Sequence, residues 1–458
     1  MISDKHKILT KTAEAPAEML GQAVMMSQVL HDASINNKLV KKTRNYWHML
    51  GPGLTTGASD DDPSGIATYS QTGAQYGFGL LWLAPWTLPL MATVQEMCAR
   101  IGMVTGRGLA GNIRIFFSKR ILYLCTALLF AANAFNIGAD LGAMAKATQL
   151  LWPSLGFGWL VVGFAVFSLL LQIFTPYSKY ARYLKWLALI LLSYILSAIL
   201  AHLDWGQVLK NGFVPHIEFS KEQIVLLCAI LGTTISPYLF FWQTSQEVER
   251  GVEAGHLTVK ERQGTDAKAV KNMRIDVWTG MFLSNLVMFF IIAASGGILF
   301  PHGVHEIQSA AQAAEALRPF AGDATYFLFA IGIIGTGLLA IPVLAGSSSY
   351  ALAESLRWKE GLHRNLGQAK AFYGIIIISM LVGLGMNFIG IDPIKALIYA
   401  ALANAFVAPV VLFFIVRISS SKKHMGHWVN RPLTTAIGWV VFALMTVSAV
   451  AAIWALLG

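Results

Sequence analysis

Long runs of apolar residues are the feature that most constrains what this chain can form. LYLCTALLFAANAFNIGADLGAMA (122–145) and FYGIIIISMLVGLGMNFIGI (372–391) hold a single charged residue between them. About 20 predominantly apolar residues are the length at which a helix crosses the hydrocarbon core of a bilayer. Charged residues make up only 13% of the 458, about half the share found in ordinary soluble domains. The sequence therefore predicts an all-α polytopic membrane protein.

The apolar runs divide the chain into about eleven expected transmembrane spans. They cover residues 47–72, 77–103, 121–150, 156–175, 182–202, 222–248, 275–299, 324–356, 371–391, 393–416 and 433–457. A polar tail (1–46) precedes them, without the pattern of a cleavable signal peptide. We expect this tail to be cytoplasmic and residues 47–458 to form one transmembrane domain.

Basic residues alternate with the spans and predict the orientation of the chain. Lys and Arg gather in the tail and in every second loop, as in 107–120 and 260–274, whereas WPSLGFG (152–158) has none. Basic loops stay on the cytoplasmic side, which predicts a cytoplasmic N-terminus and an outer C-terminus in a bacterial inner membrane. The net charge of +10 thus needs no nucleic-acid partner. The three scattered cysteines form neither a disulfide framework nor a metal motif.

Two spans are interrupted by residues that break helices. The first span contains GASDDDPSG (57–65) and the sixth contains LGTTISPY (231–238). Proline removes a backbone donor and clashes with the preceding turn. The breaks lie five spans apart, an odd number, so two five-span repeats (47–202 and 222–416) would have opposite orientations, with 433–457 as an extra span. Broken helices at matching positions of inverted repeats point to a transporter site near the bilayer midplane.

Three consecutive acids, Asp60, Asp61 and Asp62, lie in the first break. A charge at membrane depth is costly and by default marks an ion or substrate pathway. Asp62 directly precedes Pro63, where its carboxylate can join carbonyl oxygens that the break leaves free. Such hard oxygen ligands suit Mg²⁺, Mn²⁺, Ca²⁺ or Na⁺. Successive helical positions are about 100° apart, so the three acids cannot all face one cavity, and Asp60 and Asp61 equally suit a solvated vestibule or a pairing with an arginine.

In combination, these motifs resemble the Nramp family of divalent-metal transporters. The stretch 51–82, with DPSGIATYSQTGAQYGFGLLW, resembles the family's first span, whose motif is Asp-Pro-Gly-Asn, and LGTTISPYLFF (231–241) is similar to its sixth, which carries Met-Pro-His. Further similar segments are QEMCARIGMVTGRGLA (95–110), LFAIGIIGTG (328–337) and NAFVAP (404–409). The resemblance implies a leucine-transporter-type fold of two inverted five-helix repeats plus one extra helix. It also implies transport of a divalent cation by alternating access.

The resemblance implies roles for particular residues. Asp62 matches the metal-binding aspartate, and Thr233 matches a position that offers a backbone carbonyl. Asp140 matches an aspartate of the third span associated with proton movement. Asn404 matches a polar position near the site in the tenth span.

The departures from the family motifs change the expected chemistry. Gly65 replaces the asparagine, Ser236 the methionine and Tyr238 the histidine. A thioether is the soft ligand that favours transition metals. Without it the site offers only oxygen, as Mg²⁺ prefers, although Mn²⁺ accepts oxygen too and Fe²⁺ is not separated from either. The absence of the histidine, and Ala143 in place of an acid, weaken the case for proton coupling.

The expected metal site thus comprises five residues, and five others are assigned to a proton pathway or vestibule. The metal set is Asp62, Gly65, Thr233, Ser236 and Asn404. The pathway set is Asp61, Asp140, Tyr238, Gln243 and Glu247, of which Gln243 and Glu247 are four residues apart and share a helix face. We expect the divalent cation to be the transported substrate, with no further cofactor and the lipid bilayer as surroundings.

Other classes of function fit the sequence less well. A channel would show a repeated pore loop, and an enzyme would show a nucleophile or metal constellation; neither pattern is found. The remaining alternative is a cation-coupled symporter of a small organic substrate such as an amino acid. Binding a substrate carboxylate would favour free helix N-termini without a competing acid, so Asp62 favours a cationic cargo.

Overall fold

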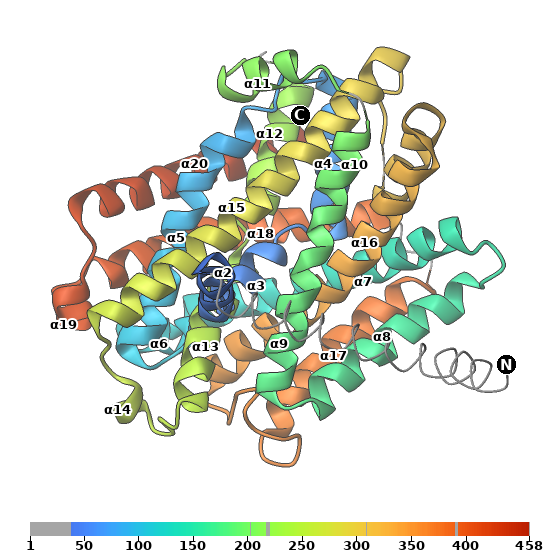
Figure 1. Cartoon of the computed structure of the whole chain (residues 1–458). Helices are drawn as coiled ribbons and strands as arrows, with labels where there is room; N and C mark the ends of the chain where they lie inside the picture. Colours follow the sequence, from blue (N-terminus) through green and yellow to red (C-terminus); the bar gives the residue numbers. More distant parts are fainter. Residues whose placement is uncertain (1–37, 202, 217–219, 308, 390–392, 458) are drawn as a thin grey trace, which may run out of the picture. The chain divides into compact units, whose positions relative to one another are not determined.

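The computed structural model describes residues 38–201, 203–216, 220–307, 309–389 and 393–457 (Figure 1). The chain divides into two units, Met1–Leu50 and Gly51–Gly458. Helix α2 (Lys38–Met49) is the part of the first unit that the structure describes. Residues 1–37, most of the predicted tail, lie outside the described ranges. All other helices of the described residues belong to the second unit.

The second unit is helical along nearly all of its described length. Its helices are α3 (Pro52–Ala58), α4 (Pro63–Tyr76), α5 (Leu83–Thr105), α6 (Leu109–Phe116), α7 (Lys119–Leu151), α8 (Phe157–Phe174), α9 (Tyr177–Leu187), η1 (Ala188–Leu191), α10 (Leu192–Leu200), α11 (Trp205–Phe213), α12 (Lys221–Thr234), α13 (Pro237–Glu253), α14 (Val259–Arg262), α15 (Ala267–Ile298), η2 (Phe300–His302), α16 (Ala310–Leu356), α17 (Lys370–Met386), α18 (Pro393–Ser419), α19 (Lys422–Met425), η3 (Gly426–Trp428) and α20 (Pro432–Leu457).

Seven segments of the described chain are long enough and apolar enough to cross a membrane. They are Lys119–Leu151, Phe157–Phe174, Tyr177–Leu200, Lys221–Glu253, Ala267–His302, Ala310–Leu356 and Pro432–Ala452. The expected first span is cut into short helices, and α17 has only 17 residues. The count of about eleven spans therefore stays a prediction.

Both helix breaks expected from the sequence are present. Helix α3 ends at Ala58 and α4 begins at Pro63, while α12 ends at Thr234 and α13 begins at Pro237. Each second half begins with proline, which lacks the N–H that the first turn leaves unpaired and has a φ suited to a helix start. The first interrupted helix begins at Pro52 rather than near residue 47. Pro52, like Pro63 and Pro237, starts a new helix and so separates α3 from α2.

The packing of the helices in the first half of the second unit matches the packing in its second half. Helix α15 packs against α3 and α4, and α5 packs in the same way against α13 and α12. Helix α7 of the first half corresponds to α16 of the second. Helix α7 contacts α18 and α8, and α16 makes the matching contacts with α10 and α17. These pairs match when the first five expected spans are superposed on the next five. Helix α20 packs on α18, α12 and α5, and α15 and α5 lie side by side in Figure 1.

Helix α3 lies in direct backbone contact with α15. A Cβ on Gly57 would overlap the backbone of Gly280, and one on Gly280 would overlap the backbone of Gly53. The buried carboxylate of Asp276 on α15 also accepts hydrogen bonds from the start of α3. Its donors are the backbone N–H groups of Gly51 (2.8 Å), Gly53 (2.9 Å) and Leu54 (3.0 Å). Glycine and one carboxylate thus fix the first half of the broken helix on its neighbour.

Candidate functional site

Asp62 is held at the start of α4 by its own local sequence. Its Oδ1 accepts a hydrogen bond from the Gly65 backbone N–H at 2.7 Å and from the Ser64 hydroxyl at 2.6 Å. This is an N-cap, in which a side-chain oxygen satisfies a donor of the first helical turn. Gly65, expected among the metal ligands, therefore contributes an N–H that orients Asp62. Asp62 is buried, with 3% of its surface exposed, and both hydrogen bonds use the same oxygen.

At the second break, the Ser236 side chain forms hydrogen bonds with the end of α12. Its hydroxyl donates to the backbone carbonyl of Thr233 at 2.8 Å and to that of Gly232 at 3.0 Å. The Thr233 hydroxyl itself donates to the carbonyl of Ile230 at 3.0 Å. Ser236 thus points back onto the end of α12, and the Thr233 carbonyl, expected as a metal ligand, accepts a hydrogen bond here. A carbonyl oxygen has two lone pairs, so Thr233 can still accept a cation.

Tyr238 joins the two breaks. Its hydroxyl donates to the backbone carbonyl of Ser59 at 2.9 Å, across 179 positions of sequence. Helices α4 and α12 are also in contact, as are α3 and α13. The breaks of the first and sixth spans are therefore neighbours. Tyr238 was expected along a pathway, which stays a prediction; its hydroxyl connects α13 to the loop that carries the acids.

A cavity of about 490 Å³ lies beside the start of α4. Its wall is formed by Pro63 and Ser64, by Asp140 on α7, and by the start of α16. Other lining residues are Ala67, Ala139, Gly142, Ala143, Lys146, Gln149, Leu150, Phe157, Ser309, Ala310, Ala311, Gln312 and Glu315. Lys146, Ser309, Gln312 and Glu315 are exposed. The cavity therefore leads from the surface to the residues that follow Asp62.

Asp140 is the buried acid in the wall of this cavity. Neither of its carboxylate oxygens has a hydrogen-bond partner within the described residues. Its charge and that of Asp62 repel each other. Ala143, one helical turn further along α7, lines the same cavity. Asp140 thus lies buried in the cavity wall near Asp62, and its role along a pathway stays a prediction.

Helix α13 carries the other expected pathway residues on a buried face. The Gln243 side-chain amide donates to Oε1 of Glu247 at 3.2 Å, which confirms that the two residues share a face. Both are buried, with 0% and 4% of their surface exposed. Neither residue lines the cavity. This side of the breaks is packed in the present conformation.

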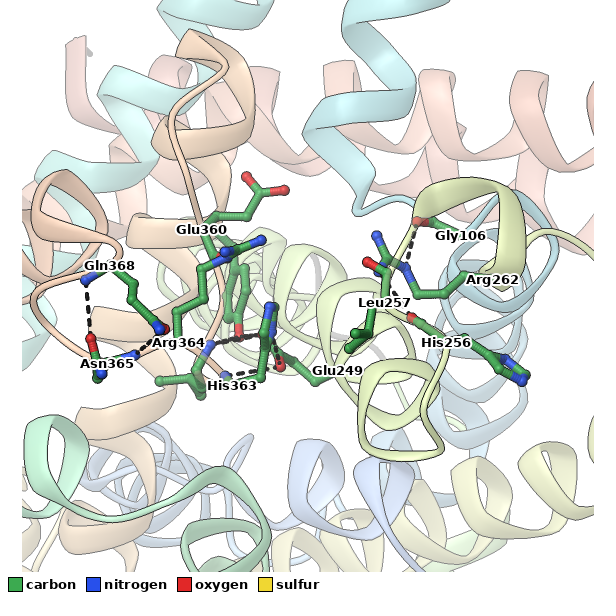
Figure 2. Close-up of polar contacts among 12 residues, drawn as sticks. Gly106, Glu249, His256, Leu257, Arg262, Glu360, His363, Arg364, Asn365 and Gln368 are labelled. Carbon is green, nitrogen blue, oxygen red and sulfur yellow. Dashed lines mark hydrogen bonds and ion pairs between the residues drawn. The ribbon is translucent and has the colours of Figure 1, made fainter.

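A polar cluster closes the far end of α13 (Figure 2). Both oxygens of Glu249 accept hydrogen bonds from α16 and from the loop that follows it. The donors are the Tyr350 hydroxyl (2.7 Å), the backbone N–H groups of Leu362 (2.8 Å) and His363 (3.2 Å), and Nδ1 of His363 (2.8 Å). Arg262, the last residue of α14, donates to the carbonyls of Gly106 at 3.3 Å and Leu257 at 2.7 Å. These bonds connect α13 to α16 and the loop after it, and α14 to the end of α5.

The structure brings together part of the expected metal set. Asp62 and Gly65 are in contact, as are Thr233 and Ser236, and the two breaks adjoin. Asn404 is buried on α18, which packs against α12 and α13, and its side-chain oxygen has no hydrogen-bond partner in the described chain. No group of three or more His, Cys, Asp or Glu side chains suited to a metal occurs among the described residues. A cation at the breaks would thus combine Asp62 with carbonyl and hydroxyl oxygens.

Sequence reasoning missed two residues beside Asp62. Ser64 bonds the Asp62 carboxylate and lines the cavity. Tyr69, one and a half turns along α4, is fully buried with an unpartnered hydroxyl near the acids of the first break. The Asp-Pro-Ser order was a usable signal for Ser64, because a serine two positions after an N-cap can reach its side chain. Tyr69 had no such signal, since its environment depends on distant helices.

Comparison with known proteins supports one family over nearly the whole chain. The family model described as natural resistance-associated macrophage protein-like (Nramp) matches residues 53–455. A protein of Deinococcus radiodurans named divalent metal cation transporter MntH is 26% identical over 419 residues, which cover 89% of this chain and 90% of that protein. Its namesake from Caldanaerobacter subterraneus is 23% identical over 415 residues, 88% of this chain and 92% of the relative. These relatives are transporters, in agreement with the expectation that the chain is not an enzyme.

Solved structures agree on the fold. The manganese transporter of Eremococcus coleocola superposes with a TM-score of 0.67 at 20% identity, covering 90% of this chain and 87% of that one. Mhp1, a nucleobase-cation-symport-1 family transporter, superposes with a TM-score of 0.55 at 16% identity, covering 89% and 91%. The all-α, leucine-transporter-type fold expected from the sequence is therefore confirmed. Since the family model spans nearly the entire helical unit, this chain belongs to the Nramp family of integral membrane proteins.

Proposed function

We propose that this protein is a secondary transporter that imports divalent metal cations by alternating access. The observation that carries the proposal is the position of Asp62: a buried carboxylate at a helix break, one residue from a cavity that opens to the surface. The second break adjoins it and supplies carbonyl oxygens at the end of α12. The names of the relatives, divalent metal cation transporters, support the same cargo.

The donor atoms around the breaks favour oxygen-preferring ions. Carboxylate, carbonyl and hydroxyl oxygens are present, and Ser236 stands where a thioether would select softer metals. Mg²⁺ keeps several of its waters and needs only one or two carboxylates, and a 490 Å³ cavity has room for a hydrated ion. We propose Mg²⁺ or Mn²⁺ as cargo, with Fe²⁺ as a further candidate.

The conformation supports alternating access. The cavity reaches Asp140 and the start of α4 from the side of Ser309 and Gln312, while the Glu249 cluster closes the end of α13. The charge bias of the loops supports a cavity on the outer side and a Glu249 cluster on the cytoplasmic side. Import would then require the cluster around Glu249 to open after the cavity has closed.

Uptake into proteoliposomes tests the proposal. A metal-sensitive dye and a pH dye inside the vesicles would follow Mg²⁺, Mn²⁺ and Ca²⁺, with Asp62→Ala as the site variant. Asp323→Ala is the matched control, because 82% of that side chain is exposed. We expect Mg²⁺ and Mn²⁺ uptake in the wild type and in Asp323→Ala, little acidification, and loss of uptake in Asp62→Ala.

Two results would contradict the proposal in different ways. Full uptake by a folded Asp62→Ala variant would remove Asp62 from the site while leaving metal transport intact. Absence of metal uptake, together with cation-driven uptake of an amino acid, would favour the symporter of a small organic substrate.

A further inference from the structure

The cavity does not account for two of the three acids in the first break. Asp60 and Asp61 expose 1% and 0% of their surface, and neither lines the cavity. Two buried carboxyl groups carry a large desolvation cost unless each binds a proton or a counter-charge accompanies them. No Lys, Arg or His within the described ranges forms an ion pair with either acid.

The hydrogen bonds of this pair are incomplete. Ser284 on α15 donates its hydroxyl to Oδ2 of Asp60 at 3.0 Å. The other oxygen of Asp60 and both oxygens of Asp61 have no hydrogen-bond partner in the part of the chain that the structure describes. Buried polar atoms are normally paired, so three unpaired carboxylate oxygens in one place indicate a missing partner.

A buried hydroxyl on α4 lies near the same acids. Tyr69 is fully buried, and its hydroxyl oxygen makes no hydrogen bond among the described residues. It interacts electrostatically with Asp60 and Asp61, and it also lies near the hydroxyls of Thr233 and Thr234 at the end of α12. A hydroxyl can donate to a carboxylate or ligate a cation through its lone pairs. Tyr69 therefore adds a neutral oxygen to the two acids.

We propose that Asp60, Asp61 and Ser284, with the Tyr69 hydroxyl, form a second cation site separate from Asp62. All of its donors are oxygens, which are the ligands of hard cations such as Na⁺ and Mg²⁺. A bound cation balances charge that nothing else in the described surroundings balances. The site joins the first break to α15, so its occupant holds the start of α4 against the second repeat. Cation binding here does not require that the protein transport a metal.

Thermal unfolding of the purified protein tests this site. Every variant is made in an Asp62→Asn background, which removes the charge of the proposed transport site while an asparagine keeps the N-cap. Melting temperatures are measured in choline chloride, NaCl and MgCl₂ at equal ionic strength. Added substitutions are Asp61→Asn, Ser284→Ala and the exposed control Asp323→Asn.

We expect a saturable rise of the melting temperature with Na⁺ or Mg²⁺ in the Asp62→Asn protein and in the Asp323→Asn control. The ion that produces the rise identifies the occupant. Asp61→Asn should abolish the rise. Ser284→Ala should raise the half-saturating concentration about tenfold, the effect of losing one hydrogen bond to a charged group.

The proposal is overturned if neither cation stabilises the Asp62→Asn protein, or if Asp61→Asn leaves the rise unchanged. Should Asp61→Asn fail to fold, Ser284→Ala decides, and an unaltered half-saturating concentration in that variant would refute the site. Because the readout is stability in solution, failure of metal uptake in proteoliposomes is a separate result.

Discussion

Ser236 shows how one residue can change the chemistry of a helix break. Its hydroxyl bonds back to the carbonyls of Gly232 and Thr233, so it stabilises the end of α12 and occupies part of the Thr233 carbonyl. A hydroxyl engaged in two such bonds has a lone pair for a cation but no further proton to donate. The selectivity of the site should therefore depend strongly on what stands at this position.

Replacing Ser236 with methionine should shift selectivity toward transition metals. The thioether adds a soft ligand and cannot donate to the Thr233 carbonyl, which is then free. We expect Ser236→Met to raise the ratio of Mn²⁺ to Mg²⁺ uptake several-fold in proteoliposomes. Ser236→Ala is the matched control, since it frees the carbonyl without adding sulfur. Equal ratios in the two variants would show that position 236 does not contact the metal.

The surroundings of a residue could be predicted from the sequence only where its partners lie nearby along the chain. Asp62 was identifiable because the proline after it fixes a helix start, and its bonds to Ser64 and Gly65 are local. The partners of Tyr238 and Ser284 lie 179 and 224 positions away, so no local pattern indicated them. Tyr238 was expected along a pathway because of the histidine it replaces, yet its hydroxyl is bonded to the Ser59 carbonyl.

At the level of elements, Asp276 performs the task of a helix cap from another helix. Three N–H groups at the start of α3 converge on its buried carboxylate. The first four N–H groups of a helix have no partner within the helix, and α3 has only seven residues. A short half-helix can therefore persist because α15 supplies its cap and the Gly57–Gly280 contact supplies its packing.

Removing this cap should destabilise the protein. We expect Asp276→Ala to lower the free energy of unfolding by about 2–3 kcal/mol, because three buried donors lose a charged acceptor. Thermal unfolding in detergent would measure the change. Asp266→Ala is the comparison, since Asp266 caps the exposed start of α15 through a single bond to Ala269 at 2.7 Å, for which about 1 kcal/mol is typical. Similar losses in the two variants would show that the α3 contact is unimportant.

Hydropathy predicted the long elements and missed the short ones. Helices α7, α8, α15 and α20 follow the expected spans, whereas α6, α11 and α14 are too short for an apolar window to detect. Helix α16 runs from Ala310 to Leu356 but is kinked at Gly322, whose φ is +84°, so its second part begins close to the expected start at 324.

At the scale of the whole molecule, a pH-sensitive acid, Glu360, lies near Glu249 in the loop that follows α16. Burial, followed by the negative charges of Glu354 and Glu249, raises the pKa of Glu360 to about 10, and Arg262 and Arg364 oppose the rise. The folded protein then keeps a proton that the unfolded chain loses above its ordinary pKa of 4.5. Stability from this residue is therefore present at low pH and declines as the pH rises from about 4.5 toward 10.

Glu360→Gln should remove that decline, because the amide stays neutral at every pH. We expect the variant to gain more in melting temperature over the wild type at pH 9 than at pH 5. Glu261→Gln is the opposite control, since hydrogen bonds from the Thr258 cap lower the pKa of Glu261, and its removal should bring no gain at pH 9. An equal gain for Glu360→Gln at both pH values would mean that Glu360 is ionised throughout.

Under the proposed transport mechanism, the cavity beside the start of α4 would also determine where the membrane voltage acts. Water in an open cavity conducts, so little of the voltage would fall between the surface and Ser64, which lines the cavity. Most of it would fall across the packed half, along α13 and up to Glu249. A divalent ion crossing that half is driven by about 4.6 kcal/mol per 100 mV, at about 2.3 kcal/mol for each charge. Voltage would therefore accelerate release through the Glu249 end, while entry through the cavity would depend on ion concentration alone.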